Sequence, residues 1–203
     1  MKKTKKLFLP YIYFTKIMKK ALSYALSDED IRRLNPNTKL LLYEDVKRFK
    51  TIDQLLAPFD SAIILYEWHR THDSSIGHYI TVNRVGSVQP GQILIEHFDS
   101  YGIKPDKELN QLRGASMEFK KMTGQDHKYL LDLYAKSHWP ISYNQYKLQS
   151  PAGNIATCGR YAVLRSKYKH MPLDEFVKLF IGRRESPDEM AVLLTEPGLR
   201  SPI

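Results

Sequence analysis

Three segments rich in β-branched and aromatic residues follow one another in the middle of this 203-residue chain. They are SAIILYEW (61–68), HYITVNRV (78–85) and ILIEHFD (93–99), and turn-forming stretches such as DSSIG and GSVQPGQ bound them. Such segments predict strands, so the chain is expected to fold around a β-sheet in its middle.

Helical patterns lie on both sides of these segments. Ser27 is a suitable N-cap for LSDEDIRRL, acidic residues fill the first turn, and Asn35-Pro36 ends it. A further strand is expected in WPISYNQYKLQ (139–149). The other helix-prone segments are 43–49, 51–59, 105–137, 158–170, 172–182 and 186–196. Grouped strands with helices on both sides predict an α+β fold, a central and mainly antiparallel sheet flanked by helices.

The length and the cysteine content limit the class of protein. A chain of 203 residues fits one domain with a buried core. The single cysteine, Cys158, excludes an internal disulfide, so a reducing compartment such as the cytosol or nucleus is expected rather than secretion. No stretch approaches the ~18 apolar residues of a membrane span.

The positive charge is concentrated at the N-terminus. Seven lysines and no acidic residue lie within residues 1–20, and they carry most of the net charge of +9. Pro10 interrupts a short, tyrosine-rich apolar run, which argues against a signal peptide. We therefore expect a basic arm over residues 1–20 and a single domain over 21–203. The arm is either solvated or in contact with a membrane surface, or it binds nucleic acid through Lys2, Lys3, Lys5 and Lys6.

The hairpin of segments 78–85 and 93–99 places a histidine and an acid on one face. A loop centred between Val88 and Gln89 sets His78 opposite Asp99, with Cβ atoms ~4.5–5.5 Å apart. A tight QPGQ turn instead slides the pair apart by four residues, and hairpin twist favours the longer loop. Both registers keep His78 and Asp99 on one face. Taken singly, each has a structural interpretation, as a half-buried histidine and a turn-forming aspartate.

Cys158 follows a loop of small and polar residues and begins a helix-prone segment. A helix N-terminus and a neighbouring imidazolium both lower the pKa of a thiol. Gln149 ends the preceding predicted strand, and its side-chain amide and the Cys158 N–H are suited to binding an oxyanion. A buried core thiol is the alternative for Cys158 alone. The set of histidine, acid, glutamine and cysteine favours a nucleophile, and its order along the chain excludes a papain-like enzyme.

Four short motifs carry a resemblance to a known superfamily. They are GHYITV, EHFDSYG, YKLQ and TCGRYAV, in this order. The chain resembles adenain-like and SUMO-protease-like cysteine peptidases, and within them the viral maturation proteases of adenoviruses, virophages and Polinton-type elements, over about residues 22–196. The resemblance implies the adenain-like cysteine protease fold, with the nucleophile at a helix N-terminus. The spacing of Gln149 and Cys158 is long for these proteins, so residues 150–157 are expected to bulge unless another donor serves.

The resemblance also implies roles for individual residues. The nucleophile, general base, orienting acid and oxyanion donor are, in this order, Cys158, His78, Asp99 and Gln149. Trp68 and Tyr79 are expected at the substrate cleft, with core packing as the alternative for Trp68. No metal is required, and a lone cysteine supports no zinc site. DNA is implied as an activator, which the basic arm permits, whereas a peptide activator linked through a second cysteine is not expected.

Three functional hypotheses follow from these features. The first is a cysteine endopeptidase that cleaves viral capsid precursor proteins during maturation, in the virion and in the host cytoplasm or nucleus. The second is a deubiquitinase- or deSUMOylase-like protease that acts on host ubiquitin-like conjugates. The third, from another class, is a non-catalytic basic protein that binds nucleic acid.

Overall fold

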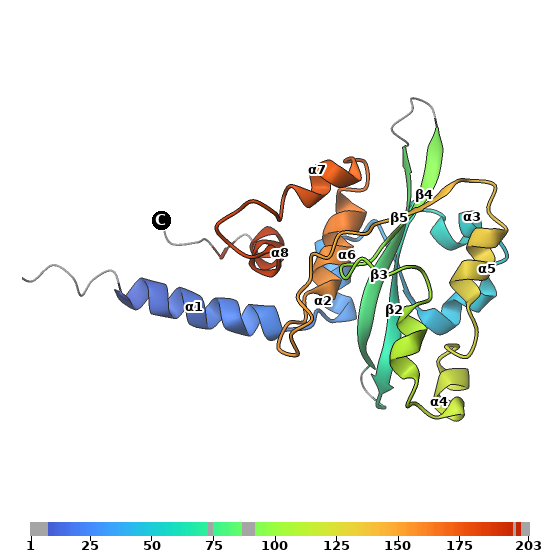
Figure 1. Ribbon diagram of the computed structural model, residues 1–203, viewed down its shortest axis with the longest axis horizontal. Coiled ribbons are helices and arrows are strands. Elements are labelled where there is room, and N and C mark those ends of the chain that lie inside the picture. Colours follow the sequence, from blue (N-terminus) through green and yellow to red (C-terminus); the bar gives the residue numbers. More distant parts are fainter. Residues whose placement is uncertain (1–7, 73–74, 87–91, 197, 200–203) are drawn as a thin grey trace, which may run out of the picture.

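The computed structural model describes residues 8–72, 75–86, 92–196 and 198–199. A five-stranded sheet lies at the centre, and helices cover both of its faces (Figure 1). The predicted α+β fold, with a central sheet flanked by helices, is therefore confirmed.

The strand order in the sheet follows the order along the chain. The strands are β1 (Lys39–Leu42), β2 (Ser61–Arg70), β3 (Ser75–Gly86), β4 (Ile93–Phe98) and β5 (Ile141–Tyr143). The three predicted central strands, β2, β3 and β4, are confirmed and pair antiparallel. The edge strands β1 and β5 pair parallel to their neighbours, and β1 had not been predicted because KLLL is too short to show a period.

The predicted strand over 139–149 is correct only for residues 141–143. Beyond them, the Asn144 side chain takes over the hydrogen bonding that a ladder would supply. Its Oδ1 accepts from the backbone N–H of Asp99 and its Nδ2 donates to the Asp99 carbonyl, both at 2.8 Å. Farther along, the N–H groups of Leu148 and Gln149 both donate to the Ser100 carbonyl. The side-chain hydrogen bonds of Asn144 and these two backbone hydrogen bonds thus replace the strand and fix the backbone around Asp99 and Ser100.

One face of the sheet packs against short helices on the right of Figure 1. These elements are η1 (Tyr43–Arg48), α3 (Ile52–Leu56), η2 (Glu108–Leu112) and α5 (Tyr129–Ala135). Helix α4 (Met117–Met122) lies on the same side and buries none of its residues. Alternate residues of β2 and β3 meet the other four elements in the largest core cluster, among them Ile64, Tyr66, Ile80 and Val82. Because strand side chains alternate between the two faces, the intervening residues must meet the other helix layer.

The opposite face carries four helices. They are α2 (Asp28–Leu34), α6 (Cys158–Lys167), α7 (Leu173–Val177) and α8 (Pro187–Thr195). Ile63, Leu65 and Tyr79 pack here against α2 and α6. The predicted N-cap Ser27 accepts a hydrogen bond from the N–H of Asp30, and α2 ends at Leu34 before Asn35-Pro36, as expected.

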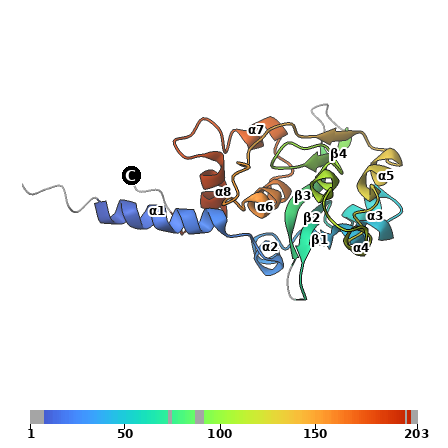
Figure 2. The ribbon, with the colours of Figure 1, turned by 60° about the horizontal axis from the view of Figure 1, so that its bottom comes forward.

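Helix α1 (Phe8–Ser23) extends away from the sheet, and the C-terminal end of α1 lies beside α8 (Figures 1 and 2). Met18 and Ala21 are buried against Val192 of α8. The boundary predicted at residue 20 therefore falls inside a helix. Lys2, Lys3, Lys5 and Lys6, the predicted nucleic-acid contacts, lie outside the described residues.

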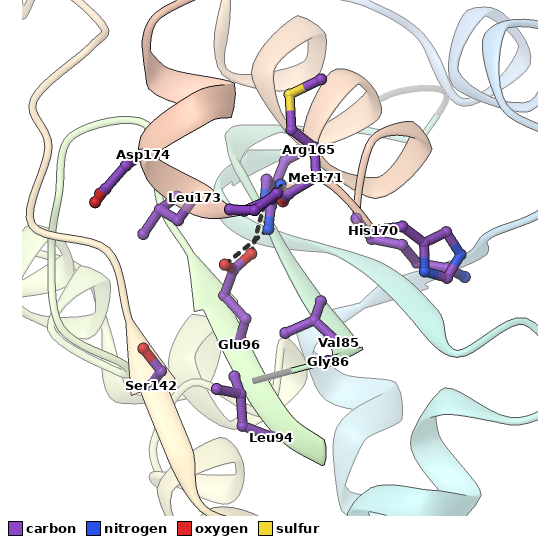
Figure 3. Close-up of a pocket in the computed structure, with 12 residues that line it drawn as sticks. Val85, Gly86, Leu94, Glu96, Ser142, Arg165, His170, Met171, Leu173 and Asp174 are labelled. Carbon is purple, nitrogen blue, oxygen red and sulfur yellow. Dashed lines mark hydrogen bonds and ion pairs between the residues drawn. The ribbon is translucent and has the colours of Figure 1, made fainter. Parts of the chain in front are cut away.

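A buried ion pair joins α6 to β4. Arg165 donates to both carboxylate oxygens of Glu96, at 2.6 and 2.9 Å, and also to the carbonyls of Tyr168 and Met171. Both charged side chains are almost fully buried, at 1% and 5% exposed. Figure 3 shows the pair beside a pocket of about 360 Å³. The ion pair fixes the C-terminal half of the helix that begins with Cys158.

Breaking this pair is expected to destabilise the fold strongly. Arg165→Met should lower the free energy of unfolding by about 3–5 kcal/mol, because Glu96 is left charged and buried. The double variant Arg165→Met/Glu96→Leu should recover much of the loss, as measured by urea unfolding. Lys178→Met, which breaks an exposed pair with Glu175, serves as the control and should leave the Tm unchanged. A loss in the double variant as large as that of Arg165→Met contradicts this account.

Candidate active site

His78 and Asp99 form a buried hydrogen-bonded pair. The Nε2 of His78 lies 2.8 Å from the Oδ2 of Asp99, and the two side chains are 1% and 0% exposed. Both predicted registers were wrong, because Val82 pairs with His97 and the ladder lies midway between them. The predicted shared face is nevertheless consistent with the contact. Alternation fixes the face of a side chain but leaves open shifts by two residues, which the loop length decides.

Two aromatic rings stack against the His78 ring. Trp68 stacks nearly parallel to it at a centroid distance of 6.1 Å, and Tyr101 at 4.9 Å. Trp68 is 42% exposed, so it lies at the surface and not in the core. The pairing of β2 with β3 is irregular at this point: Glu67 pairs with Gly77 and His69 with Ile76, and Trp68 is the extra residue. This β-bulge directs Trp68 over the imidazole.

Gly77 is required for this arrangement. A Cβ atom at this position would lie 1.8 Å from the carbonyl oxygen of Tyr66, a distance that no side chain tolerates. The glycine in GHYITV therefore allows the backbone of β3 to approach β2 immediately before His78. Any side chain at Gly77 is expected to displace the imidazole.

Cys158 is the first residue of α6 and is 8% exposed. It packs with Tyr79, Leu26 and Ala162. A Cβ atom at Gly159 would lie 3.3 Å from both Leu26 and Tyr79, so this glycine lets the first turn of α6 approach the sheet closely. The thiol is held at a helix N-terminus, where free N–H groups favour a thiolate.

The side chains of Cys158, His78 and Asp99 shift the pKa values of one another. Burial raises the pKa of Cys158, but the hydrogen bond and charge of His78, with the backbone N–H groups of Tyr79 and Gly159, bring it below its usual value. For His78, burial lowers the pKa, and the charge and hydrogen bond of Asp99 together with Cys158 raise it to about 10. Both shifts favour the thiolate–imidazolium form of the pair, the form in which a cysteine is nucleophilic.

Gln149 lies near this site, and a hydrogen bond to its side-chain oxygen fixes its orientation. Its Oε1 accepts a 2.7 Å hydrogen bond from the Ser100 hydroxyl, so its Nε2 amide group points away from Ser100. Residues 151–154 are exposed and contain a turn, so the long segment between Gln149 and Cys158 projects at the surface, in agreement with the predicted bulge. Asp188 of α8 holds both ends of the bulge, since it accepts from the Ser150 N–H and the Thr157 hydroxyl.

Tyr79, the other residue expected at the substrate cleft, is 8% exposed, and its hydroxyl donates to Asp28 of α2 at 2.9 Å. It also contributes to the wall of a pocket of about 600 Å³ beside α2. Tyr79 therefore packs against the first turn of α6 and borders a cavity. Its contact with substrate remains a prediction.

Several residues of the site had not been predicted. Ser100 and Tyr101 directly follow Asp99 in the motif EHFDSYG, and this position could have indicated that they belong to the site. The sequence around Asp188 and Glu108 gives no such indication. Among the described residues, one group of His, Cys, Asp or Glu side chains is close enough to hold a metal ion. It consists of His78, Asp99 and Glu108, whose potential ligand atoms lie within 4.8 Å of one another.

Fold and site together define an α+β protein with a buried thiol at a helix N-terminus beside a histidine–aspartate pair. No family model matches the sequence. The chain is 31% identical over 176 residues to the "Uncharacterized protein V9" of Sputnik virophage, an alignment that covers 84% of this chain and 94% of that protein. The chain belongs to the family of this virophage protein, which confirms the virophage side of the predicted resemblance.

Two solved protease structures are similar to the chain at low sequence identity. One is the ASFV pS273R protease, with 14% identity, a TM-score of 0.43, and coverage of 85% of this chain and 67% of that one. Another is the SUMO protease Ulp1, with 14% identity, a TM-score of 0.28, and coverage of 91% and 77%. Both likenesses are too distant to transfer an activity.

Proposed function

We propose that this protein is a cysteine endopeptidase with Cys158 as its nucleophile. The observation that carries the proposal is the buried His78–Asp99 pair beside a thiol at the start of α6. This arrangement lowers the pKa of the thiol while raising that of the imidazole. A core cysteine without a catalytic role needs neither an imidazolium nor a carboxylate behind it.

In the proposed reaction, the Cys158 thiolate attacks the carbonyl carbon of the scissile peptide bond and forms a tetrahedral intermediate. The Nε2 amide of Gln149 and the N–H of Cys158 stabilise its oxyanion, each by about 3 kcal/mol in comparable sites. His78 then protonates the leaving amine, and the acyl-enzyme forms. Water, deprotonated by His78, attacks the acyl-enzyme and releases the second product, and Asp99 holds the imidazole throughout.

We further propose capsid precursor proteins as substrates, cleaved during virion maturation in the virion or the infected cell. The membership in a virophage protein family supports a role in a viral cycle. The net charge of +9 supports DNA as an activator that binds the basic arm. No described helix is long and apolar enough to cross a membrane.

Alkylation of the only cysteine provides a direct test. Iodoacetamide should label Cys158 in the folded protein with a midpoint well below the ordinary thiol pKa of ~8.5, because His78 stabilises the thiolate. His78→Gln should shift the midpoint above that value, since only the backbone N–H groups of Tyr79 and Gly159 then oppose the effect of burial. Mass spectrometry across pH measures both curves. Labelling of the folded wild type only at alkaline pH, or only in denaturant, contradicts the proposal.

The substrate class is tested separately with a matched pair of substrates. A capsid precursor of the virus and a ubiquitin-like precursor are incubated with the full chain, with and without DNA. Cleavage of the capsid precursor supports the proposed substrate. Cleavage of the ubiquitin-like precursor alone assigns the protein to host conjugates instead.

A further inference from the structure

Glu108, at the start of η2, is 2% exposed and lies within the core of the protein. Neither of its carboxyl oxygens accepts a hydrogen bond from the residues that the structure describes. The phenols of Tyr66 and Tyr134, themselves buried, lie near it. A carboxylate in such surroundings is strongly destabilised unless a partner is found.

The nearest chemical partner is the Asp99 carboxylate. One oxygen of Glu108, one oxygen of Asp99 and one ring nitrogen of His78 all lie within 4.8 Å of one another. Two buried carboxyl groups at this separation cannot both be ionised at neutral pH without a large electrostatic cost. One of the two must therefore carry a proton.

The hydrogen bonds of Asp99 decide which one. Its Oδ2 faces the Nε2 of His78 at 2.8 Å, and its Oδ1 accepts from the N–H of Tyr101 at 2.6 Å. Both contacts stabilise the ionised form of Asp99, whereas Glu108 has no comparable donor among the described residues. The proton therefore belongs on Glu108, and the resulting O–H needs an acceptor.

We propose that neutral Glu108 donates a hydrogen bond to the Asp99 carboxylate and is a positioning residue for the His78–Asp99 pair. The role of Glu108 in catalysis rests on the proposed function. With three donors around it, the Asp99 carboxylate cannot rotate away from His78, and the imidazole keeps its orientation toward Cys158. Burial, and then Asp99, raise the pKa of Glu108 well above its usual value, in agreement with this assignment.

The same three side chains also have the composition of a metal site. A divalent cation there requires both carboxylates to be ionised and separates His78 from Asp99. A neutral Glu108 requires the opposite, a retained proton and an intact His78–Asp99 hydrogen bond. The two alternatives therefore differ in the protonation of Glu108 and in their response to a chelator.

The first experiment compares Glu108→Gln with Glu108→Leu in the full chain. Leucine removes the donor, and kcat should fall about tenfold while KM stays unchanged, because Glu108 does not touch substrate. Glutamine keeps an N–H donor and should restore most of kcat. Asp106→Asn is the matched control, another buried acid two residues away that is bound instead to Tyr43 and Tyr66. It should lower the Tm and leave kcat intact.

The second experiment does not depend on activity and uses Cys158→Ala as the background. Infrared spectroscopy at neutral pH should show the carbonyl stretch of a protonated carboxyl group, which disappears in Glu108→Gln. The hydrogen-bonded Nε2–H proton of His78 should give a low-field NMR resonance that shifts in Glu108→Leu and not in Asp106→Asn. If no peptide is cleaved by the wild type but both signals appear, the proposed function fails and the role of Glu108 in holding Asp99 stands.

Three results overturn the inference. One is the absence of the protonated carboxyl band, or its persistence in Glu108→Gln. Another is a Glu108→Gln variant as impaired in kcat as Glu108→Leu. The last is loss of wild-type activity on dialysis against EDTA with recovery on addition of Zn²⁺ or Mg²⁺, which assigns the three side chains to a metal instead.

Discussion

Cys158→Ala is expected to reduce peptide cleavage by about 10⁴-fold or more, the largest change in activity that a single substitution in this chain should produce. In the proposed reaction, the thiolate at the start of α6 forms the covalent bond to substrate, and no neighbouring group can replace it in that step. Cys158→Ser should be similarly inactive, because His78 stabilises a thiolate and does not deprotonate a serine hydroxyl in its place. The kcat/KM of both variants on a cleaved precursor measures the effect.

The fold should survive this substitution. Cys158 contributes one small side chain to a core cluster of eight buried residues, so the free energy of unfolding should fall by about 1 kcal/mol. Retention of DNA by the inactive variant separates catalysis from the basic arm. Cleavage that persists in Cys158→Ala contradicts the assignment of the nucleophile, and loss of both cleavage and folded structure indicates a purely structural cysteine.

Local patterns were sufficient to predict most of the elements, and they singled out His78, Asp99 and Cys158, which the structure brings together. The strands were recognisable from β-branched residues and the ends of α2 from its cap, because these signals act within a few positions. The shared face of His78 and Asp99 followed from a period of two, which is insensitive to loop length. The register was not predictable, since a period of two leaves open shifts by two residues.

The unpredicted part of the site depends on contacts between distant elements. Glu108 follows Lys107 in a polar stretch that reads as surface, and only the packing of η2 against the sheet buries it beside Asp99. Asp188 lies on α8, 30 residues after Cys158, and reaches the bulge between Gln149 and Cys158 because α8 packs against α6. No periodicity or spacing in one sequence records such contacts.

Asp99→Asn is expected to lower kcat/KM by about 10³–10⁴-fold, because an amide cannot hold and charge-stabilise the imidazole as a carboxylate does. It should also destabilise the fold by about 3 kcal/mol near pH 6, since protonated His78 is then buried without its counter-charge. The alkylation midpoint of Cys158 should shift toward alkaline pH in parallel. Asp174→Asn makes the same charge change at an exposed site on α7 and should alter neither activity nor Tm.

The loss of stability should depend on pH in a defined way. Although burial opposes it, Asp99 raises the folded-state pKa of His78 from 6.5 to about 10, so the stabilisation is complete below about pH 6.5 and disappears as the pH rises through 10. Despite its own burial, Asp99 has its pKa lowered by His78 from 3.8 to about 2, so its share is present above about pH 4 and disappears as the pH falls through 2. Urea unfolding of wild type and Asp99→Asn should therefore differ most between about pH 4 and 6.5, and progressively less toward pH 10. A difference that stays constant across this range indicates that His78 is neutral in the folded protein, and the thiolate–imidazolium pair is then excluded.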